Sequence, residues 1–172
     1  MNYKFFLVRN LFHQIFCALL FICLLLLIPS SSEAKLEVFQ LNEGESYHRS
    51  LESLRALDYQ TWQVVCYQNV NKKDSLTLRI VGYPGNVRLD HPTDLTVDSG
   101  RHHWLLKDKT LLNKELANDP RDAAAEFDIT PLIKDLTNNR PLRLSLQGIF
   151  NDLPIPPYLV GEWRSLLKST VN

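Results

Sequence analysis

The stretch TWQVVCYQ, residues 61–68, alternates at every step between two kinds of side chain. Trp62, Val64 and Cys66 share one face, and the residues between them share the other. This period of two is typical of a strand with one buried face, because successive side chains on a strand point to opposite sides. The stretch therefore predicts a β-strand that places Trp62 in the core and Cys66 as a buried, unreactive thiol.

Two further stretches show the same alternation. LTLRIVG, residues 76–82, sets three aliphatic residues against Thr77, Arg79 and Val81, and LRLSLQG, residues 142–148, alternates leucines with polar residues. Between the first two strands, QNVNKKDS is short and polar, which predicts the loop of an antiparallel hairpin.

The neighbouring segments are harder to assign. YHRSLESLRAL, residues 47–57, carries leucines spaced for a helical stripe, yet it can equally pair as a strand with Trp62 through the turn at Asp58. We favour the strand, and we expect a further strand over RHHWLLK. The stretch from Lys107 to Phe127 predicts a loop with one helical turn.

Helical signals are few and short. Thr130 and Pro131 give an N-cap and a first helical residue, which predicts a two-turn helix near 131–136. After an extended PIPP run, the apolar spacing in YLVGEWRSLLKS predicts an amphipathic C-terminal helix. The expected fold is mainly β, an antiparallel sheet forming a sandwich or small open barrel, closed by that helix.

The first 34 residues have the features of a signal peptide. Lys4 and Arg9 precede an uncharged apolar run from Ile15 to Ile28, and small residues precede an expected cleavage after Ala34. A run of 14 residues is shorter than the roughly 20 that a spanning helix needs. A retained N-terminal anchor is the alternative. We therefore expect an exported single β-rich domain over residues 35–172 with no membrane span after cleavage.

Composition narrows the partners. Lys4, Arg9 and Glu33 leave with the leader, so the 19 basic and 19 acidic residues become 17 and 18. A net charge near zero argues against nucleic acid as a partner. Only Cys66 remains after cleavage, so no internal disulfide can form. The sequence does not indicate an oligomeric state.

No catalytic or metal-binding motif is present. His102 and His103 are adjacent and would point to opposite faces of a strand, and no zinc or serine-hydrolase spacing accompanies them. We expect no metal and no cofactor. Spare aromatic residues beside polar loops favour a binding surface instead. A cluster of mostly acidic residues is interpreted as solvated loop side chains. Its members are Asn118, Asp119, Asp122, Glu126 and Asp128.

The stretch VGYPGNVRLDHP, residues 81–92, allows two interpretations. It can hold Asp90 and His91 at a pocket, or it can simply connect two strands. Its glycine and proline spacing favours a connector. The candidate binding residues, should a pocket exist here, are Tyr83, His91, Arg101 and His102.

Seven motifs together resemble a family of small exported cyanobacterial proteins of unknown function. They are SYHRSLESL, TWQVVCYQ, LRIVGYPG, DHP, EFDITPLI, LRLSL and LPIPPYLVGEW, and the resemblance spans roughly Leu41 to Trp163. It implies the periplasm or the thylakoid lumen and a role beside a photosynthetic or envelope complex. It assigns no functional residue.

The leading hypothesis is an exported, non-catalytic module that binds a protein partner or assists a membrane complex. The alternative is a small ligand-binding protein or hydrolase that uses a pocket near the four candidate residues.

Overall fold

A computed structural model describes residues 37–40, 46–71 and 74–168. The chain divides into two units, Met1–Glu33 and Ala34–Asn172, and the described residues all belong to the second. The expected leader, residues 1–34, lies outside the described residues, and its cleavage stays a prediction.

The first sheet contains five antiparallel strands in the spatial order β1-β2-β3-β4-β7. The alternation in β3 is strict, with Trp62, Val64 and Cys66 buried. The strands predicted at 61–68 and 76–82 are confirmed, and 47–57 lies mostly in a strand. The bounds are β1 Glu37–Gln40, β2 Ser46–Arg55, β3 Thr61–Asn69, β4 Thr77–Val81 and β7 Ala124–Asp128.

The second sheet contains four antiparallel strands in the order β6-β5-β8-β9. Strand β8 confirms the prediction at 142–148, and β6 confirms the one over RHHWLLK. Pro154 lies in β9, which is an edge strand, where a missing N–H costs no ladder bond. The bounds are β5 Leu95–Ser99, β6 His102–Leu106, β8 Leu142–Leu146 and β9 Phe150–Ile155.

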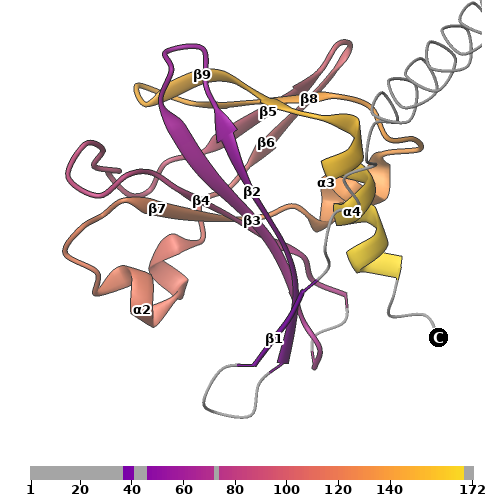
Figure 1. Cartoon of the computed structure of the whole chain (residues 1–172), viewed down its shortest axis with the longest axis horizontal. Coiled ribbons are helices and arrows are strands. Elements are labelled where there is room, and N and C mark those ends of the chain that lie inside the picture. The colour runs from indigo at the N-terminus through magenta and orange to yellow at the C-terminus, as the bar shows by residue number, and fades with distance from the viewer. Residues whose placement is uncertain (1–36, 41–45, 72–73, 169–172) are drawn as a thin grey trace, which may run out of the picture. The chain divides into compact units, whose positions relative to one another are not determined.

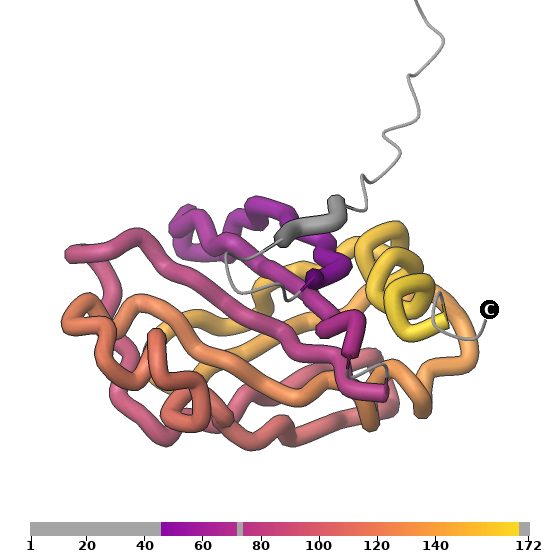
Figure 2. The backbone as a smooth tube through the Cα atoms, turned by 90° about the horizontal axis from the view of Figure 1, so that it is seen from below, coloured from indigo at the N-terminus to yellow at the C-terminus, as the bar shows by residue number. Residues whose placement is uncertain are grey.

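The two sheets enclose one hydrophobic core, to which Phe127 of the first sheet and Leu144 of the second both belong. On one side, Asp108 pairs with Phe127 in an isolated bridge, so the chain leaving β6 reaches β7. On the other side, β2 contacts β9. The sheets therefore form an open sandwich and no closed barrel, as predicted. Figure 2 shows the strands from below.

The helical elements lie at the two ends of the strands (Figure 1). At one end, α3 Thr130–Asp135 packs beside α4 Pro157–Lys168, which also contacts β2 and β3. The amphipathic prediction for α4 is confirmed, because Leu159, Trp163 and Leu166 are buried. At the other end lies α2 Lys114–Ala117, preceded by η1 Thr110–Leu112. No helix in the described part of the chain is long and apolar enough to cross a bilayer.

Two local predictions were wrong. The stretch 107–127 is more than a loop with one helical turn, because its last residues form β7, an edge strand defined by pairing with β4. Thr130 does not cap α3 from the preceding position. It is already helical, Ile129 is the N-cap residue, and the Thr130 Oγ1 accepts a hydrogen bond from the N–H of Leu76 at 2.8 Å.

Candidate functional site

The four residues predicted for a pocket do not form one cluster. Tyr83 lies 70% exposed in the connector between β4 and β5. Arg101 lies in the β5–β6 turn, and His102 is the first residue of β6, paired with Ser99 at the end of β5. His91 instead precedes the opposite end of β5. A strand rises about 3.4 Å per residue, so the length of β5 separates His91 from the other two.

His91 is held by a carboxylate that sequence reasoning missed. Asp90 is exposed, and the Nδ1 of His91 lies instead 2.6 Å from Oδ2 of Asp108. The side chains of His91 and Asp108 are only 9% and 1% exposed. Asp108 follows β6, so the fold, and not adjacency in the chain, brings the pair together.

Asp108 accepts several further hydrogen bonds. The N–H of Thr93 donates to Oδ2 at 2.8 Å, and both the N–H and the hydroxyl of Thr110 donate to Oδ1, at 2.8 and 2.5 Å. Burial alone would raise the pKa of Asp108, but the hydrogen bonds from Thr110, His91 and Thr93 together lower the pKa below its usual value. Asp108 is therefore a buried anion that joins the connector at His91 and Thr93 to the start of the segment at Thr110.

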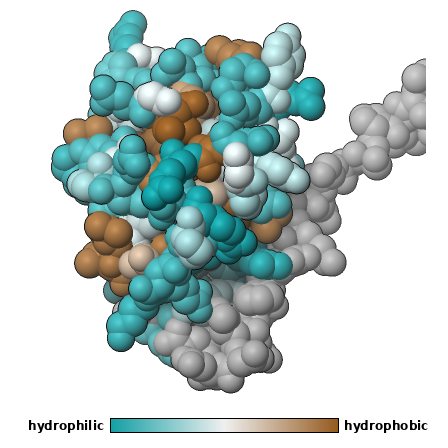
Figure 3. All heavy atoms as spheres, turned by 90° about the vertical axis from the view of Figure 1, so that its left-hand side faces the viewer, coloured by the Kyte–Doolittle hydropathy of each residue, from teal (hydrophilic) through white to brown (hydrophobic). Residues whose placement is uncertain are grey.

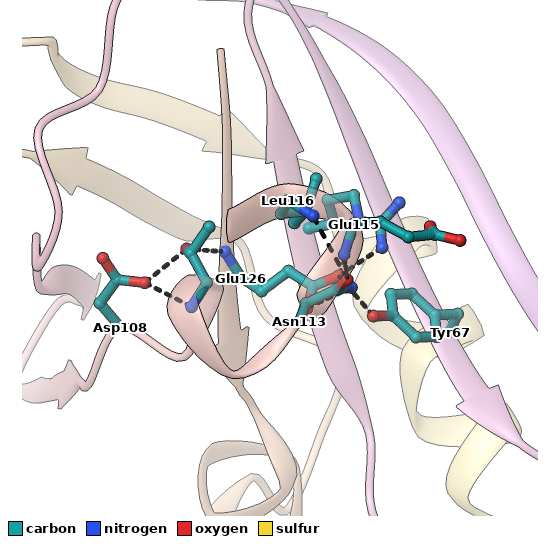
Figure 4. Close-up of polar contacts among 8 residues, drawn as sticks. Tyr67, Asp108, Asn113, Glu115, Leu116 and Glu126 are labelled. Atoms are coloured by element: carbon teal, nitrogen blue, oxygen red, sulfur yellow. Dashed lines mark hydrogen bonds and ion pairs between the residues drawn. The ribbon is translucent and has the colours of Figure 1, made fainter. Parts of the chain in front are cut away.

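Thr110 links Asp108 to a second buried acid. Its Oγ1 accepts a hydrogen bond from the N–H of Glu126 at 2.9 Å. The carboxylate of Glu126 accepts from the hydroxyl of Tyr67 at 2.5 Å, from Nε of Arg79 at 2.7 Å and from Nδ2 of Asn113 at 3.2 Å (Figure 4). The interpretation of Glu126 as a solvated loop acid was wrong, because the residue is 5% exposed.

Strand register explains why these groups meet. Arg79 and Glu126 are direct partners across β4 and β7, on the face that points away from the core. Tyr67 of β3 lies on the same face, with its ring centroid 5.5 Å from the Arg79 guanidinium. Burial and the neighbouring Glu126 raise the pKa of Tyr67. Burial opposes the charge of Arg79, yet Glu126 and Tyr67 more than compensate and raise the pKa of Arg79.

This network fastens η1 and α2 over the outer face of the first sheet. The N–H of Lys109 donates to the carbonyl of Glu126 at 2.8 Å. The side chain of Asn113 caps α2 by accepting from the N–H groups of Glu115 and Leu116, while its amide donates to Glu126. We call the set Tyr67, Arg79, Asp108, Thr110, Asn113 and Glu126 the buried network.

The cysteine and the two adjacent histidines that the sequence singled out are engaged in packing or in pairing with neighbouring side chains. Cys66 is a free, buried thiol, which confirms its predicted burial, and burial followed by the charge of Glu162 raises its pKa. His102 stacks on Trp104 with centroids 5.7 Å apart, and His103 pairs with Asp98. Within the described ranges, no group of three or more His, Cys, Asp and Glu is arranged to hold a metal ion.

Replacing Asp108 with asparagine is expected to flatten the acid limb of the stability profile. A lowered folded pKa means that the carboxylate stabilises the fold above its unfolded pKa of about 3.9 and loses this contribution as pH falls through the folded value. Urea unfolding between pH 7 and pH 3 measures it. At pH 7 the variant should lose about 1.5 to 3 kcal/mol, because the amide cannot accept all the same donors. A parallel profile for the exposed control Asp90→Asn should match the wild type, and an unchanged slope in Asp108→Asn would contradict the assignment.

Two antiparallel sheets around one core, with an outer helical segment fixed by buried carboxylates, define a small β-rich domain of the open-sandwich class. Within that class the chain belongs to the family described as Protein of unknown function (DUF3122), whose model matches residues 34–166. No curated protein and no solved structure matches the chain. Membership of an uncharacterised family is thus confirmed, and the family supplies no activity.

Proposed function

We propose that this domain is an exported, non-catalytic module that binds a protein partner through the leucines of η1. Leu111 and Leu112 are 59% and 80% exposed. They sit between Thr110 and Asn113, two residues whose side chains belong to the buried network. The proposal rests on this observation: two large apolar side chains are exposed to solvent on a segment whose position is fixed by buried hydrogen bonds.

Rigid presentation is what makes these leucines suited to binding. Association costs the ordering of side chains and loops, and a segment that is already ordered avoids much of this cost. Here Asp108 and Glu126 fix the backbone on both sides of the leucines through Thr110, Lys109 and Asn113. In this proposal the two acids only hold the segment in place, because Asp108 binds Thr110 and Glu126 binds Asn113.

The surface around α2 agrees with a modest, specific contact. Figure 3 faces the side on which Figure 1 places α2, and it shows separate hydrophobic patches among hydrophilic atoms. Patches of this kind mark contact sites on soluble domains more often than scattered single residues do. A central apolar anchor with a polar surround is the usual anatomy of a transient protein interface.

Export is supported by the leader pattern and by the extent of the family match. The match begins at residue 34, where the apolar run and its small residues have ended. We place the mature domain in the periplasm or thylakoid lumen of a cyanobacterium, where it assists an envelope or photosynthetic membrane complex. Mass spectrometry of the native protein tests this placement: a first residue at Lys35 supports cleavage, and retention of Met1 in a soluble cytosolic product contradicts it.

Replacing both η1 leucines with serine is expected to abolish partner capture. The tagged native protein and Leu111→Ser/Leu112→Ser are each used for affinity capture from the native compartment, with quantitative mass spectrometry of what is retained. A partner held through η1 should fall at least tenfold, because interface anchors contribute about 2 kcal/mol or more. Thermal unfolding should remain near that of the wild type, since both side chains are exposed.

The matched control is Leu57→Ser/Tyr59→Ser. These residues are also large and exposed, at 68% and 79%, but they lie in the turn between β2 and β3. Capture that survives this control and fails in the η1 variant supports the proposal. Equal capture by all three proteins, or no partner with the wild type, would sink it.

A further inference from the structure

A second feature, independent of η1, is a pocket at the tip of the β5–β6 hairpin. Its volume is about 420 Å³, within the range of small-molecule sites. Three chain segments of the second sheet meet there, and β2 contributes one leucine. The lining residues are Leu54, Asp98, Ser99, Gly100, Pro141, Leu142, Arg143, Pro154, Ile155 and Pro156.

The walls of this hairpin pocket are mostly apolar. Leu54 and three prolines provide the accessible apolar lining, while Leu142 and Ile155 are only 0% and 1% exposed. Proline and aliphatic side chains present no hydrogen-bonding groups. The pocket backbone is preset as well, because Gly100 turns the hairpin with a φ of +66° and Pro154 fixes its own φ in β9. A ligand would therefore need an apolar body and would meet a largely preformed site.

Of the two charged residues that line the pocket, Asp98 has a side-chain partner and Arg143 has none among the described residues. Asp98 lies beside Arg143 in the strand register, but its carboxylate is paired with His103 on the other side. Among the residues that the structure describes, none forms a hydrogen bond or ion pair with the side chain of Arg143, which is exposed. Arg101 follows Gly100 directly in the chain but is not among the lining residues.

We propose that the hairpin pocket binds a small organic anion with an apolar body. The apolar walls would bury the body, and the guanidinium of Arg143 would donate two hydrogen bonds to a carboxylate or sulfonate, the geometry in which arginine binds such groups best. Asp98 also lines the pocket but is occupied by His103, so Arg143 is the lining cation without an ionic partner among the described residues and the group that an anionic ligand would bind. None of Tyr83, His91, Arg101 and His102 lines this pocket, so the proposal does not depend on the four residues that the sequence indicated.

A matched pair of fluorescent probes tests the charge requirement. The anion 8-anilinonaphthalene-1-sulfonate and its neutral parent N-phenyl-1-naphthylamine share one apolar body. Titration of the purified native protein should give tighter binding of the anion. In Arg143→Gln the affinity for the anion should fall about tenfold, while the affinity for the neutral probe should stay unchanged.

Two controls keep the outcome interpretable. Arg88→Gln removes an arginine that is 74% exposed and lies in the connector before β5, so its titration should match the wild type. Leu54→Trp narrows the hairpin pocket from β2 and should weaken both probes. The proposal is overturned if neither probe binds, if Arg143→Gln and Arg88→Gln behave alike, or if the two probes bind with equal affinity. Loss of capture by the η1 variant leaves these titrations unaffected, so the two proposals fail separately.

Discussion

Replacing Glu126 with alanine is expected to lower the free energy of unfolding by about 3 kcal/mol. Removing one partner of a buried ion pair costs about 3 to 5 kcal/mol, because the other charge stays buried without compensation. The lower end applies here, since the Arg79 side chain retains 29% exposure while that of Glu126 has 7%. The variant also leaves the hydroxyl of Tyr67 and the amide of Asn113 without their acceptor. Urea unfolding at pH 7 measures the loss.

Glu126→Gln and Glu115→Ala are the matched controls. Glutamine keeps an acceptor for Tyr67 but not the charge, so it should lose less than alanine does. Glu115 is an exposed acid on α2, and its removal should change stability by no more than about 0.5 kcal/mol. A loss below about 1 kcal/mol for Glu126→Ala would show that the ion pair is effectively solvated.

Glu126→Ala also tests whether partner binding needs a rigidly positioned η1 in addition to the exposed leucines themselves. Glu126 holds this segment through its backbone, which bonds to Lys109 and Thr110, and through its carboxylate, which accepts from the amide of Asn113. Of these, Glu126→Ala removes only the contact to Asn113. If rigid presentation of Leu111 and Leu112 matters, Glu126→Ala should weaken partner capture under conditions where the domain stays folded. Unchanged capture would restrict the role of the network to stability.

The sequence predicted β3, β4 and β8, whose burial is one-sided, but it missed β5, in which Leu95 and Val97 are buried in the same alternating way. In β3 and β8 every second residue enters the core, so the period of two is visible without any knowledge of the partners. Strand β7 was missed because its sequence, AAEFD, contains small residues and no β-branched residue, and only its pairing with β4 defines it as a strand. Strand β9 escaped because Pro154 favours an extended connector when the edge position is unknown.

The buried network could not be predicted in the same way. His91 and Asp108 are 17 positions apart, and Arg79 and Glu126 are 47 positions apart. Each pair depends on which strands are neighbours and in what register, and neither is encoded in local periodicity. A partial signal did exist, because Arg79 falls on the non-core face of its strand, where a cation invites an opposite charge on the next strand.

The connector 81–92 contributes to the core through its first glycine. Gly82 is buried, and a Cβ at this position would lie 2.8 Å from Cζ3 of Trp62 and 3.2 Å from Cβ of Val87. The Trp62 indole is fully buried and packs on Phe150 with centroids 4.8 Å apart, so it has little room to move. The Trp62 ring thus occupies the space that a side chain at position 82 would need.

Trp62→Ala is therefore expected to cost about 3 to 5 kcal/mol, the range for removing a large aromatic side chain from a packed core. Gly82→Ala should cost about 1 to 3 kcal/mol in the wild type, since an added methyl group overpacks the ring. Urea unfolding of both single variants at pH 7 measures these losses. Unfolding free energies within about 1 kcal/mol of the wild type for Trp62→Ala would contradict the packing described for β3.

The double variant tests the contact itself. With the ring of Trp62 gone, the Gly82→Ala methyl group enters the cavity instead of a filled space, so its cost should fall to near zero and the two changes should couple by at least about 1 kcal/mol. Gly161→Ala is the control: its Cβ would lie 2.7 Å from Nδ2 of Asn139, but that amide is exposed and can rotate away. Because alanine is also about 1 kcal/mol better than glycine inside a helix, Gly161→Ala should not destabilise α4. Additive losses at Trp62 and Gly82 would mean that the connector does not rest on the ring, and that the glycine is required for some other reason.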